Sequence, residues 1–149
     1  MDTLQSCTLN YLRELGCTFR AAPEGNLFTF SVQGRRGIYP VLLYAREPYL
    51  VCLAKLPDAI PDESRLEVAE YLHRANYGLL LGSFEMDYDR GEVRYRTALL
   101  TEGACPAEGV LDRYIQMPAA MLDRYAAGIE AIVLEGEIAQ EALARVEED

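Results

Sequence analysis

LFTFSVQGRRGIYPVLLYAREPYLVCLAKL, residues 27–56, has the pattern of three consecutive β-strands and constrains the fold more than any other part of the chain. Residues 27–33 alternate apolar and polar side chains, which is typical of a strand with one wet face. The segment Gly34–Gly37 supplies glycines that accept positive φ, so it predicts a turn. The next two strands, Ile38–Arg46 and Tyr49–Leu56, are apolar on both faces. Such strands are covered on two sides or meet a partner on one of them.

Helical periodicity precedes and follows this stretch. Apolar residues recur every three or four positions from Thr3 to Leu15, with Thr3 as the predicted N-cap and Gly16 as the left-handed residue beyond the end. Asp62 is predicted to cap a second helix, which runs to about Tyr77. Both helices have one apolar face and are therefore expected to pack on the sheet.

A hairpin and a helical C-terminal part complete the chain. Leu80–Tyr88 and Glu92–Leu100 are predicted to be the two strands of the hairpin. After Pro106 the chain is predicted to be helical, with a new helix starting at Pro118, because proline suits the first turn of a helix and not its interior. A short final helix is predicted over Ile138–Val146.

The order of elements is therefore α, three or four strands, α, two strands, then helices, where the additional strand is a short edge strand at Phe19–Ala22. Strands that come in runs, rather than alternating with helices, predict an α+β fold with an antiparallel sheet and not a Rossmann-type domain. The chain of 149 residues is expected to form a single domain, residues 1–149.

Charge and hydropathy limit the classes of partner. The net charge of −10 repels phosphate backbones, and the basic residues are scattered apart from Arg35 and Arg36, which are predicted to lie in an exposed turn. No stretch approaches the ~18 consecutive apolar residues of a membrane span, and the N-terminal residues MDTLQSC lack the pattern of a secretory leader. We therefore expect no nucleic-acid or membrane partner and a cytoplasmic location.

The nucleophilic and metal-ligating residues form no recognisable set. The cysteines lie at unrelated spacings, and His73 is the single histidine, so a standard zinc site is not expected. Cys7 and Cys52 fall on apolar faces and are predicted to be small core residues with free thiols. His73 is predicted to be a partly exposed helical residue. A pair formed by His73 with Cys7, Cys17, Cys52 or Cys105 stays open as the feature that would indicate an enzyme.

The segment Asp87–Glu92 is rich in carboxylates but departs from a calcium-binding loop, because Gly91 stands where an oxygen ligand is needed. A hairpin turn is the favoured interpretation. The charges also predict a register: with Arg90 and Gly91 as the two turn residues, or Asp89–Glu92 as a four-residue loop, Asp87 faces Arg94 and Glu85 faces Arg96, so that opposite charges meet.

Two further polar features have structural interpretations. The acidic pair Glu63 and Glu67, like Glu85 with its neighbour Asp87, is expected to solvate the surface, because 24 acidic residues bring carboxylates close together by chance. Asn76 lies near the end of the second helix on the side that faces the sheet, where an amide can cap carbonyls or tie the helix to the hairpin. No catalytic, cofactor-binding or metal-binding residue is predicted.

The central block carries a family resemblance. Residues 60–100 combine a helix that ends in an asparagine, Arg65–Asn76, with the stretches LGSFEMD at 81–87 and GEVRYR at 91–96. This pattern resembles the YbjN family, described as bacterial sensory transduction regulators, and the C-terminal run Tyr125–Val146 resembles the end of that family. The resemblance implies a fold like that of the small acidic dimeric chaperones of type III secretion, with helices packed on one face of the sheet. It brings no catalytic set.

These observations favour a non-enzymatic protein-binding or regulatory module, with chaperone-like action as one form of it. The alternative is a small-molecule sensor, in which the two-sided apolar strands line a ligand pocket. The strands Ile38–Arg46 and Tyr49–Leu56 also predict a homodimer, because the few helices cannot cover both of their faces. The dimer contact is expected to bury more than roughly 1,000 Å².

Overall fold

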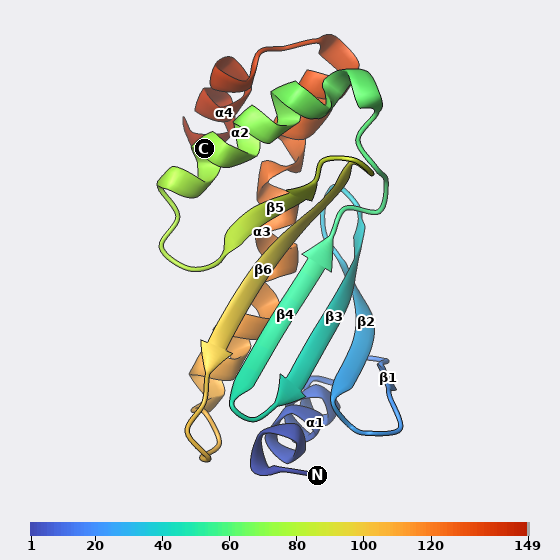
Figure 1. Ribbon diagram of the computed structural model, residues 1–149, viewed down its shortest axis with the longest axis vertical. Coiled ribbons are helices and arrows are strands. Elements are labelled where there is room, and N and C mark those ends of the chain that lie inside the picture. Colours follow the sequence, from blue (N-terminus) through green and yellow to red (C-terminus); the bar gives the residue numbers. More distant parts are fainter. Residues whose placement is uncertain (149) are drawn as a thin grey trace.

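In the computed structural model, which describes residues 1–148, a six-stranded antiparallel sheet is covered by helices (Figure 1). The elements in chain order are α1 (Thr3–Leu15), β1 (Arg20–Ala21), β2 (Leu27–Gln33), β3 (Ile38–Arg46), β4 (Tyr49–Lys55), a 3₁₀ turn (Asp62–Ser64), α2 (Arg65–Tyr77), β5 (Ser83–Asp87), β6 (Glu92–Leu100), α3 (Glu108–Glu135) and α4 (Ala139–Glu148). The predicted α+β class and the predicted element order are confirmed, including the short edge strand β1.

The strands lie in the order β1-β2-β3-β4-β6-β5, and every neighbouring pair is antiparallel. Figure 1 shows α3 running along the sheet behind β6 and β4, α1 at the lower end, and α2 and α4 together at the upper end beside β5. Buried residues alternate with more exposed ones along β3 and β4. One face of the sheet, the inner face, therefore meets the helices, and the other is the open face.

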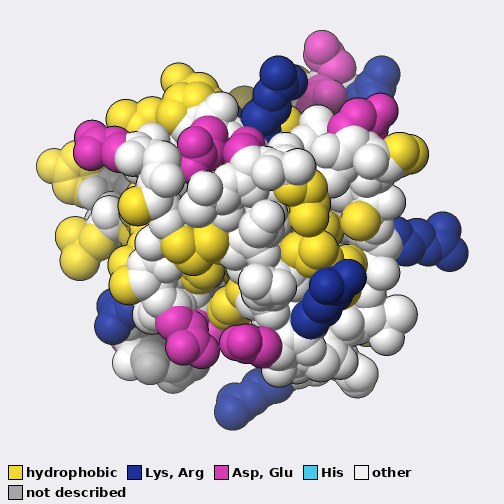
Figure 2. Space-filling view, turned by 90° about the horizontal axis from the view of Figure 1, so that it is seen from below, with side chains coloured by type: hydrophobic (Ala, Val, Ile, Leu, Met, Phe, Trp, Pro, Cys, Tyr) yellow, Lys and Arg dark blue, Asp and Glu magenta, His cyan; other side chains and the backbone are white. Residues whose placement is uncertain are grey.

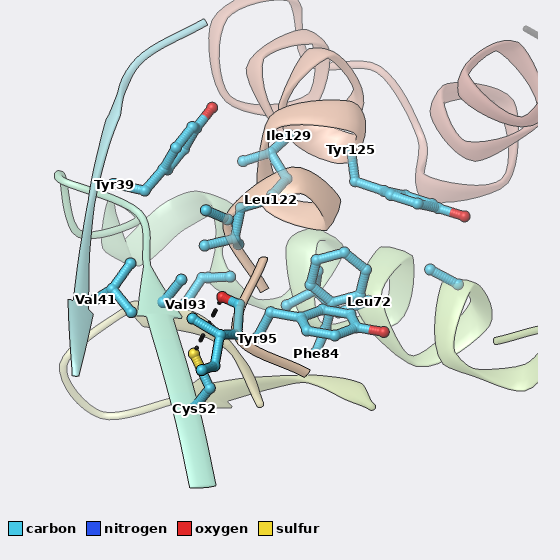
Figure 3. Close-up of a cluster of buried hydrophobic side chains, with 14 of the residues drawn as sticks. Tyr39, Val41, Cys52, Leu72, Phe84, Val93, Tyr95, Leu122, Tyr125 and Ile129 are labelled. Carbon is cyan, nitrogen blue, oxygen red and sulfur yellow. Dashed lines mark hydrogen bonds between the residues drawn. The ribbon is translucent and has the colours of Figure 1, made fainter. Parts of the chain in front are cut away.

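Aromatic residues from four elements meet in the core between α2, α3 and the β5–β6 hairpin (Figure 3). Phe84 stands edge-on to Tyr95 and to Tyr125, with ring centroids 4.8 and 5.1 Å apart. The buried Tyr71 hydroxyl donates to the carbonyl of Tyr125 at 2.8 Å, and its ring lies where any side chain on Gly128 would be. Helix α2 is therefore fixed to α3 by close packing and by one buried hydrogen bond.

The N-cap of α1 differs from the prediction. Asp2 caps this helix, not Thr3: its carboxylate accepts from the Gln5 N–H at 2.8 Å, and the Gln5 side chain accepts in return from the Asp2 N–H. This reciprocal pair is a capping box, in which two free backbone donors are satisfied at once. Gly16 ends α1 with φ of 76°, as predicted.

The predicted helix start at Pro118 is wrong, because α3 passes through this residue without a break. A proline inside a helix leaves the carbonyl four residues earlier without its donor. Here the Thr97 hydroxyl donates to that carbonyl, Tyr114 O, at 2.6 Å, and the buried Cys52 thiol donates to Ile115 O at 3.5 Å (Figure 3). The Thr97 side chain thus replaces the hydrogen bond that the helix loses at Pro118, and Cys52 adds a contact to the next carbonyl.

The predicted register of the β5–β6 hairpin is also wrong. Glu85 lies opposite Arg94, not Arg96, and Asp87 lies opposite Glu92. The four residues between the strands end in Gly91, which has φ of 77° and donates its N–H to Asp87 O at 2.7 Å. A shift of two residues leaves every side chain on its predicted face, which is why the alternation alone did not reveal it.

Cys7 is not the free core thiol that was predicted. It forms a disulfide with Cys105, with the two Cα atoms 6.0 Å apart, although 98 positions separate them in sequence. The bond joins α1 to the loop between β6 and α3, which the fold brings to the same end of the sheet. Cys52 is buried and unpaired, as predicted.

Candidate functional site

The residues that could have formed a nucleophilic pair do not come together. His73 is exposed on α2, at the upper end of the molecule, whereas the Cys7–Cys105 disulfide lies on α1 at the lower end (Figure 1). Cys52 is buried beneath α3, and burial raises the pKa of its thiol to about 12. Within residues 1–148 no group of three or more His, Cys, Asp or Glu side chains has a geometry that could hold a metal ion.

Asn76 has the structural role that was predicted for it. Its amide nitrogen donates to Phe84 O at 3.0 Å, and its amide oxygen accepts from Phe84 N at 2.8 Å. One side chain therefore satisfies both backbone groups of Phe84, at the residue where β5 enters the core. This contact ties the end of α2 to the hairpin.

Arg65 holds the loop that the sequence offered as a calcium site. Its guanidinium donates to Ile60 O at 2.9 Å and to Asp89 O at 2.7 Å, and it also reaches Arg90 O at 3.2 Å. The loop carbonyls therefore face a cation of the protein itself, and the predicted hairpin turn is confirmed. Of the family-like residues, Arg65 and Gly91 stabilise the hairpin turn beside the start of α2, and Asn76 binds the start of β5 at the other end of this helix.

In each of the two carboxylate pairs noted in the sequence, one member makes a structural contact with a group outside the pair. Glu85 forms ion pairs with Arg94, at 2.6 Å, and with Arg96 on the neighbouring strand. The Glu67 carboxylate accepts from the N–H of Ala139 at 2.7 Å, and so satisfies a free donor at the start of α4. These contacts are structural.

Asp123 is a structural residue that the sequence analysis missed. The backbone N–H groups of Arg35 and Arg36 donate to its carboxylate at 3.0 and 2.9 Å, and the Tyr39 hydroxyl donates to it at 2.8 Å. Burial alone would raise the pKa of Asp123, but these hydrogen bonds and the nearby charge of Arg35 hold it below its ordinary value. Arg35 and Arg36 are exposed, as predicted, and their turn is fastened to α3.

The open face of the sheet is the principal feature that these contacts leave unexplained. Its side chains line up in rows across the strands. In the lower half of the sheet, one row crosses four strands and contains Leu27, Tyr44, Val51 and Ala98. The next row, closer to the β3–β4 turn, contains Tyr49 and Leu100, which are 52% and 64% exposed. We call these six residues the apolar zone.

Above the apolar zone the open face is hollowed. The hollow has a volume of about 940 Å³, and Pro40, Leu42 and Leu53 form its apolar floor. Arg20 on β1 lines one side, and Lys55 on β4 lines the other together with Glu92 and Arg94 on β6. We call this space, with its floor and its three cations, the basic hollow.

The charge of the open face differs from that of the rest of the chain. Five basic residues occupy outward positions of the strands (Arg20, Arg46, Lys55, Arg94 and Arg96), against three acidic ones (Glu85, Asp87 and Glu92). The face therefore carries a net charge of +2, whereas the whole chain carries −10. The acidity of the protein lies on its helices and loops. Figure 2, which looks from the lower end, shows hydrophobic side chains exposed in several groups among scattered charges.

Comparisons with known proteins agree with this architecture. The family model YbjN, "Putative bacterial sensory transduction regulator", matches residues 9–131. A crystal structure of YbjN from E. coli, described as a putative transcription regulator, superposes with a TM-score of 0.58 at 12% sequence identity, covering 89% of each chain. At that identity the likeness concerns the fold alone. A search of the curated proteins finds no match. Over residues 1–148, no helix is both long and apolar enough to cross a bilayer.

Proposed function

This chain belongs to the YbjN family, and from that premise we propose that it is a non-enzymatic regulatory module that acts by binding other proteins. The observation that carries the proposal is the open face of the sheet, which presents apolar side chains to solvent over several neighbouring strands. Large contiguous apolar patches are rare on the surfaces of monomeric proteins, and where they occur they usually mark interaction sites. Chaperone-like action is one form of such binding.

A second copy of the chain is the proposed occupant of the apolar zone. Two chains of charge −10 repel each other, so they associate best through a surface without acidic groups. The rows of the apolar zone contain no acidic residue, and Arg46 is their one charged side chain. A two-fold axis that lies in the contact plane, perpendicular to the strands and near Tyr44 and Val51, packs the two apolar zones face to face. The two basic hollows then lie at opposite ends of the dimer.

The size of the apolar zone predicts a reversible dimer. Four strands about 4.8 Å apart and two residue rows about 7 Å apart give roughly 270 Å² of sheet plane for each copy, or roughly 540 Å² for both. Projecting side chains add to this area, but the contact stays small beside the roughly 1,000 Å² at which specific interfaces begin, and a small contact favours a reversible dimer. Added salt is expected to tighten the dimer, because it screens the repulsion between the two acidic chains.

Sedimentation over a range of concentrations tests this arrangement. Val51→Glu places a carboxylate in the apolar zone and is expected to give a monomer. Leu66→Glu is the matched control, because Leu66 is 73% exposed on α2, away from the sheet. A wild-type chain that stays monomeric at micromolar concentration and moderate salt, or a Leu66→Glu variant as defective as Val51→Glu, rejects the dimer.

Binding of other proteins is tested by site-specific photo-crosslinking in extracts of the source cells. A photoreactive residue in place of Leu53, on the open face, is expected to trap a defined protein, and the same residue at position 66 is not. The trapped protein must then bind the purified wild-type chain and bind a Leu53→Glu variant more weakly. Repeated absence of any partner from the open face contradicts the proposal.

A small-molecule sensor is the second candidate function. It is supported by the basic hollow, which the two-sided apolar strands line through Leu42 and Leu53 and whose volume lies within the range of ligand sites. A thermal-shift screen separates the two functions, because a ligand that binds the folded state raises its apparent stability by mass action. A shift with a small molecule, abolished by Leu42→Glu, favours the sensor.

A further inference from the structure

We propose that the basic hollow binds an extended segment of a partner protein in which acidic residues flank a short apolar stretch. This inference rests on the proposed protein-binding function and assigns the surface and the chemistry of the partner. The floor of the hollow supplies apolar contact through Pro40, Leu42 and Leu53, and its sides carry a net positive charge, with three cations against the one carboxylate of Glu92. An occupant that matches both is apolar in its middle and acidic at its ends.

The cations of the hollow are available to such an occupant to different degrees. Arg20 forms no ion pair with any residue in the range 1–148, and its strand, β1, is exposed at the edge of the sheet. Lys55 lies 3.9 Å from Glu92, at the limit of an ion pair, and half of its side chain is exposed. Arg94 is already paired with Glu85 at 2.6 Å. Arg20 and Lys55 are therefore the main anchors.

The spacing of these anchors defines the length of the segment. Arg20 on β1 and Lys55 on β4 are separated by three strand-to-strand steps, since β2 and β3 lie between them. Three steps of about 4.8 Å give roughly 14 Å. An extended chain advances about 3.3 Å per residue, so acidic side chains about four residues apart reach both anchors while the residues between them lie on the floor.

The shape of the hollow favours a peptide over a small molecule. Ligand sites for small molecules commonly bury 70–90% of the ligand surface. The hollow is a depression on one side of a sheet, with strands below and solvent above, so it covers one side of its occupant. An extended segment compensates for this by its length. A nucleic acid is disfavoured as the occupant. The whole chain carries −10 and the open face +2, so the rest of the chain carries −12 and repels phosphates.

Selection from an unbiased library of short displayed peptides against the wild-type chain tests the proposal. We expect enriched peptides in which Asp or Glu flanks apolar residues at the predicted spacing. Their affinity is expected to fall about tenfold in the double variant Arg20→Gln/Lys55→Gln, the effect of losing two partly exposed ionic contacts. Arg113→Gln is the matched control, since Arg113 is exposed on α3, and it is expected to bind like the wild type.

A second readout locates the peptide on the surface. Cys17 lines the hollow as a partly buried free thiol, so bound peptide is expected to slow its alkylation by a maleimide. Enrichment of basic or neutral peptides, equal loss of affinity in Arg113→Gln, or unchanged alkylation of Cys17 overturns the proposal. If these failures occur while Leu53 still crosslinks a protein in extracts, the acidic segment is rejected as the occupant of the hollow and the protein-binding function stands. Loss of both results rejects both.

Discussion

In the middle of β3 and β4 the inner and open faces of the sheet are both apolar and differ in what covers them. Leu42 and Leu43 are neighbours on β3, yet Leu43 is fully buried and Leu42 is 37% exposed. Val51 and Cys52 on β4 differ in the same way. On these two strands, apolar composition therefore does not distinguish the two faces. Helices α1 and α3 make the inner face a core, and their absence from the open face leaves it available to a partner.

The largest effect is expected when the two faces are compared at Leu43 and Leu42. Leu43→Ala leaves a cavity in the core and is expected to lower the free energy of unfolding by about 3–4 kcal/mol. Leu42→Ala removes partly exposed apolar surface and is expected to cost less than about 1 kcal/mol. Urea unfolding of both variants measures the difference. Equal losses would mean that the open face is as well covered as the inner one.

The next prediction concerns the disulfide that fastens α1 over the inner face. Cys105→Ser is expected to lower stability by about 3 kcal/mol under oxidising conditions, because the bond closes a long loop and restricts the unfolded chain. Dithiothreitol is expected to destabilise the wild type to the same extent and to leave the variant unchanged. A variant as stable as the oxidised wild type would show that packing alone holds α1 in place.

A smaller effect is expected at Asn76, which joins α2 to the hairpin. Asn76→Ala removes both hydrogen bonds to Phe84 and leaves its partly buried backbone groups without these partners, at a cost of about 2 kcal/mol. Hydrogen exchange of the β5 amides is expected to accelerate more than that of β2. Uniform acceleration across the sheet would contradict a local role for this residue.

The smallest effect is expected at Asp123, which joins the β2–β3 turn to α3. Its pKa is lower in the folded state than in the unfolded one, so its contribution is complete above the unfolded value of about 4 and is lost as pH falls through the folded pKa. Asp123→Asn is expected to cost about 1 kcal/mol at neutral pH, because hydrogen bonds to the charged form are lost. The cost is expected to vanish at acidic pH. A cost that is independent of pH would exclude the carboxylate charge as its cause.

Secondary-structure elements whose bounds depend on neighbouring residues were predicted closely. The strands Leu27–Gln33 and Ile38–Arg46 were located to the residue, because their bounds follow from alternation and from the glycines of the turn. Asn76 was assigned correctly from its place on the helix. The start at Pro118 was wrong because the donor that replaces the lost hydrogen bond, Thr97, comes from a distant strand. That information is not present near the proline.

The candidate site was predicted less completely than the fold. Two-sided apolar strands indicated that a partner meets the sheet, but the separation into an apolar zone and a basic hollow depends on register across the strands. Arg20 and Lys55 are distant in sequence and become the two sides of one depression only when β1, β2, β3 and β4 pair. The cysteine pair Cys7 and Cys105 depends in the same way on the return of the chain after β6.

The amino-acid sequence alone determined the α+β class, the order of the elements and the presence of strands with two apolar faces, because periodicity and turn residues act over a few positions. The tertiary structure decided which of those faces is covered, which cysteines meet, how the hairpin is aligned and where the positive charge of an acidic protein gathers. Each of these depends on contacts between residues far apart in the chain. Local patterns do not specify such contacts, since several pairings of the same elements satisfy them equally well.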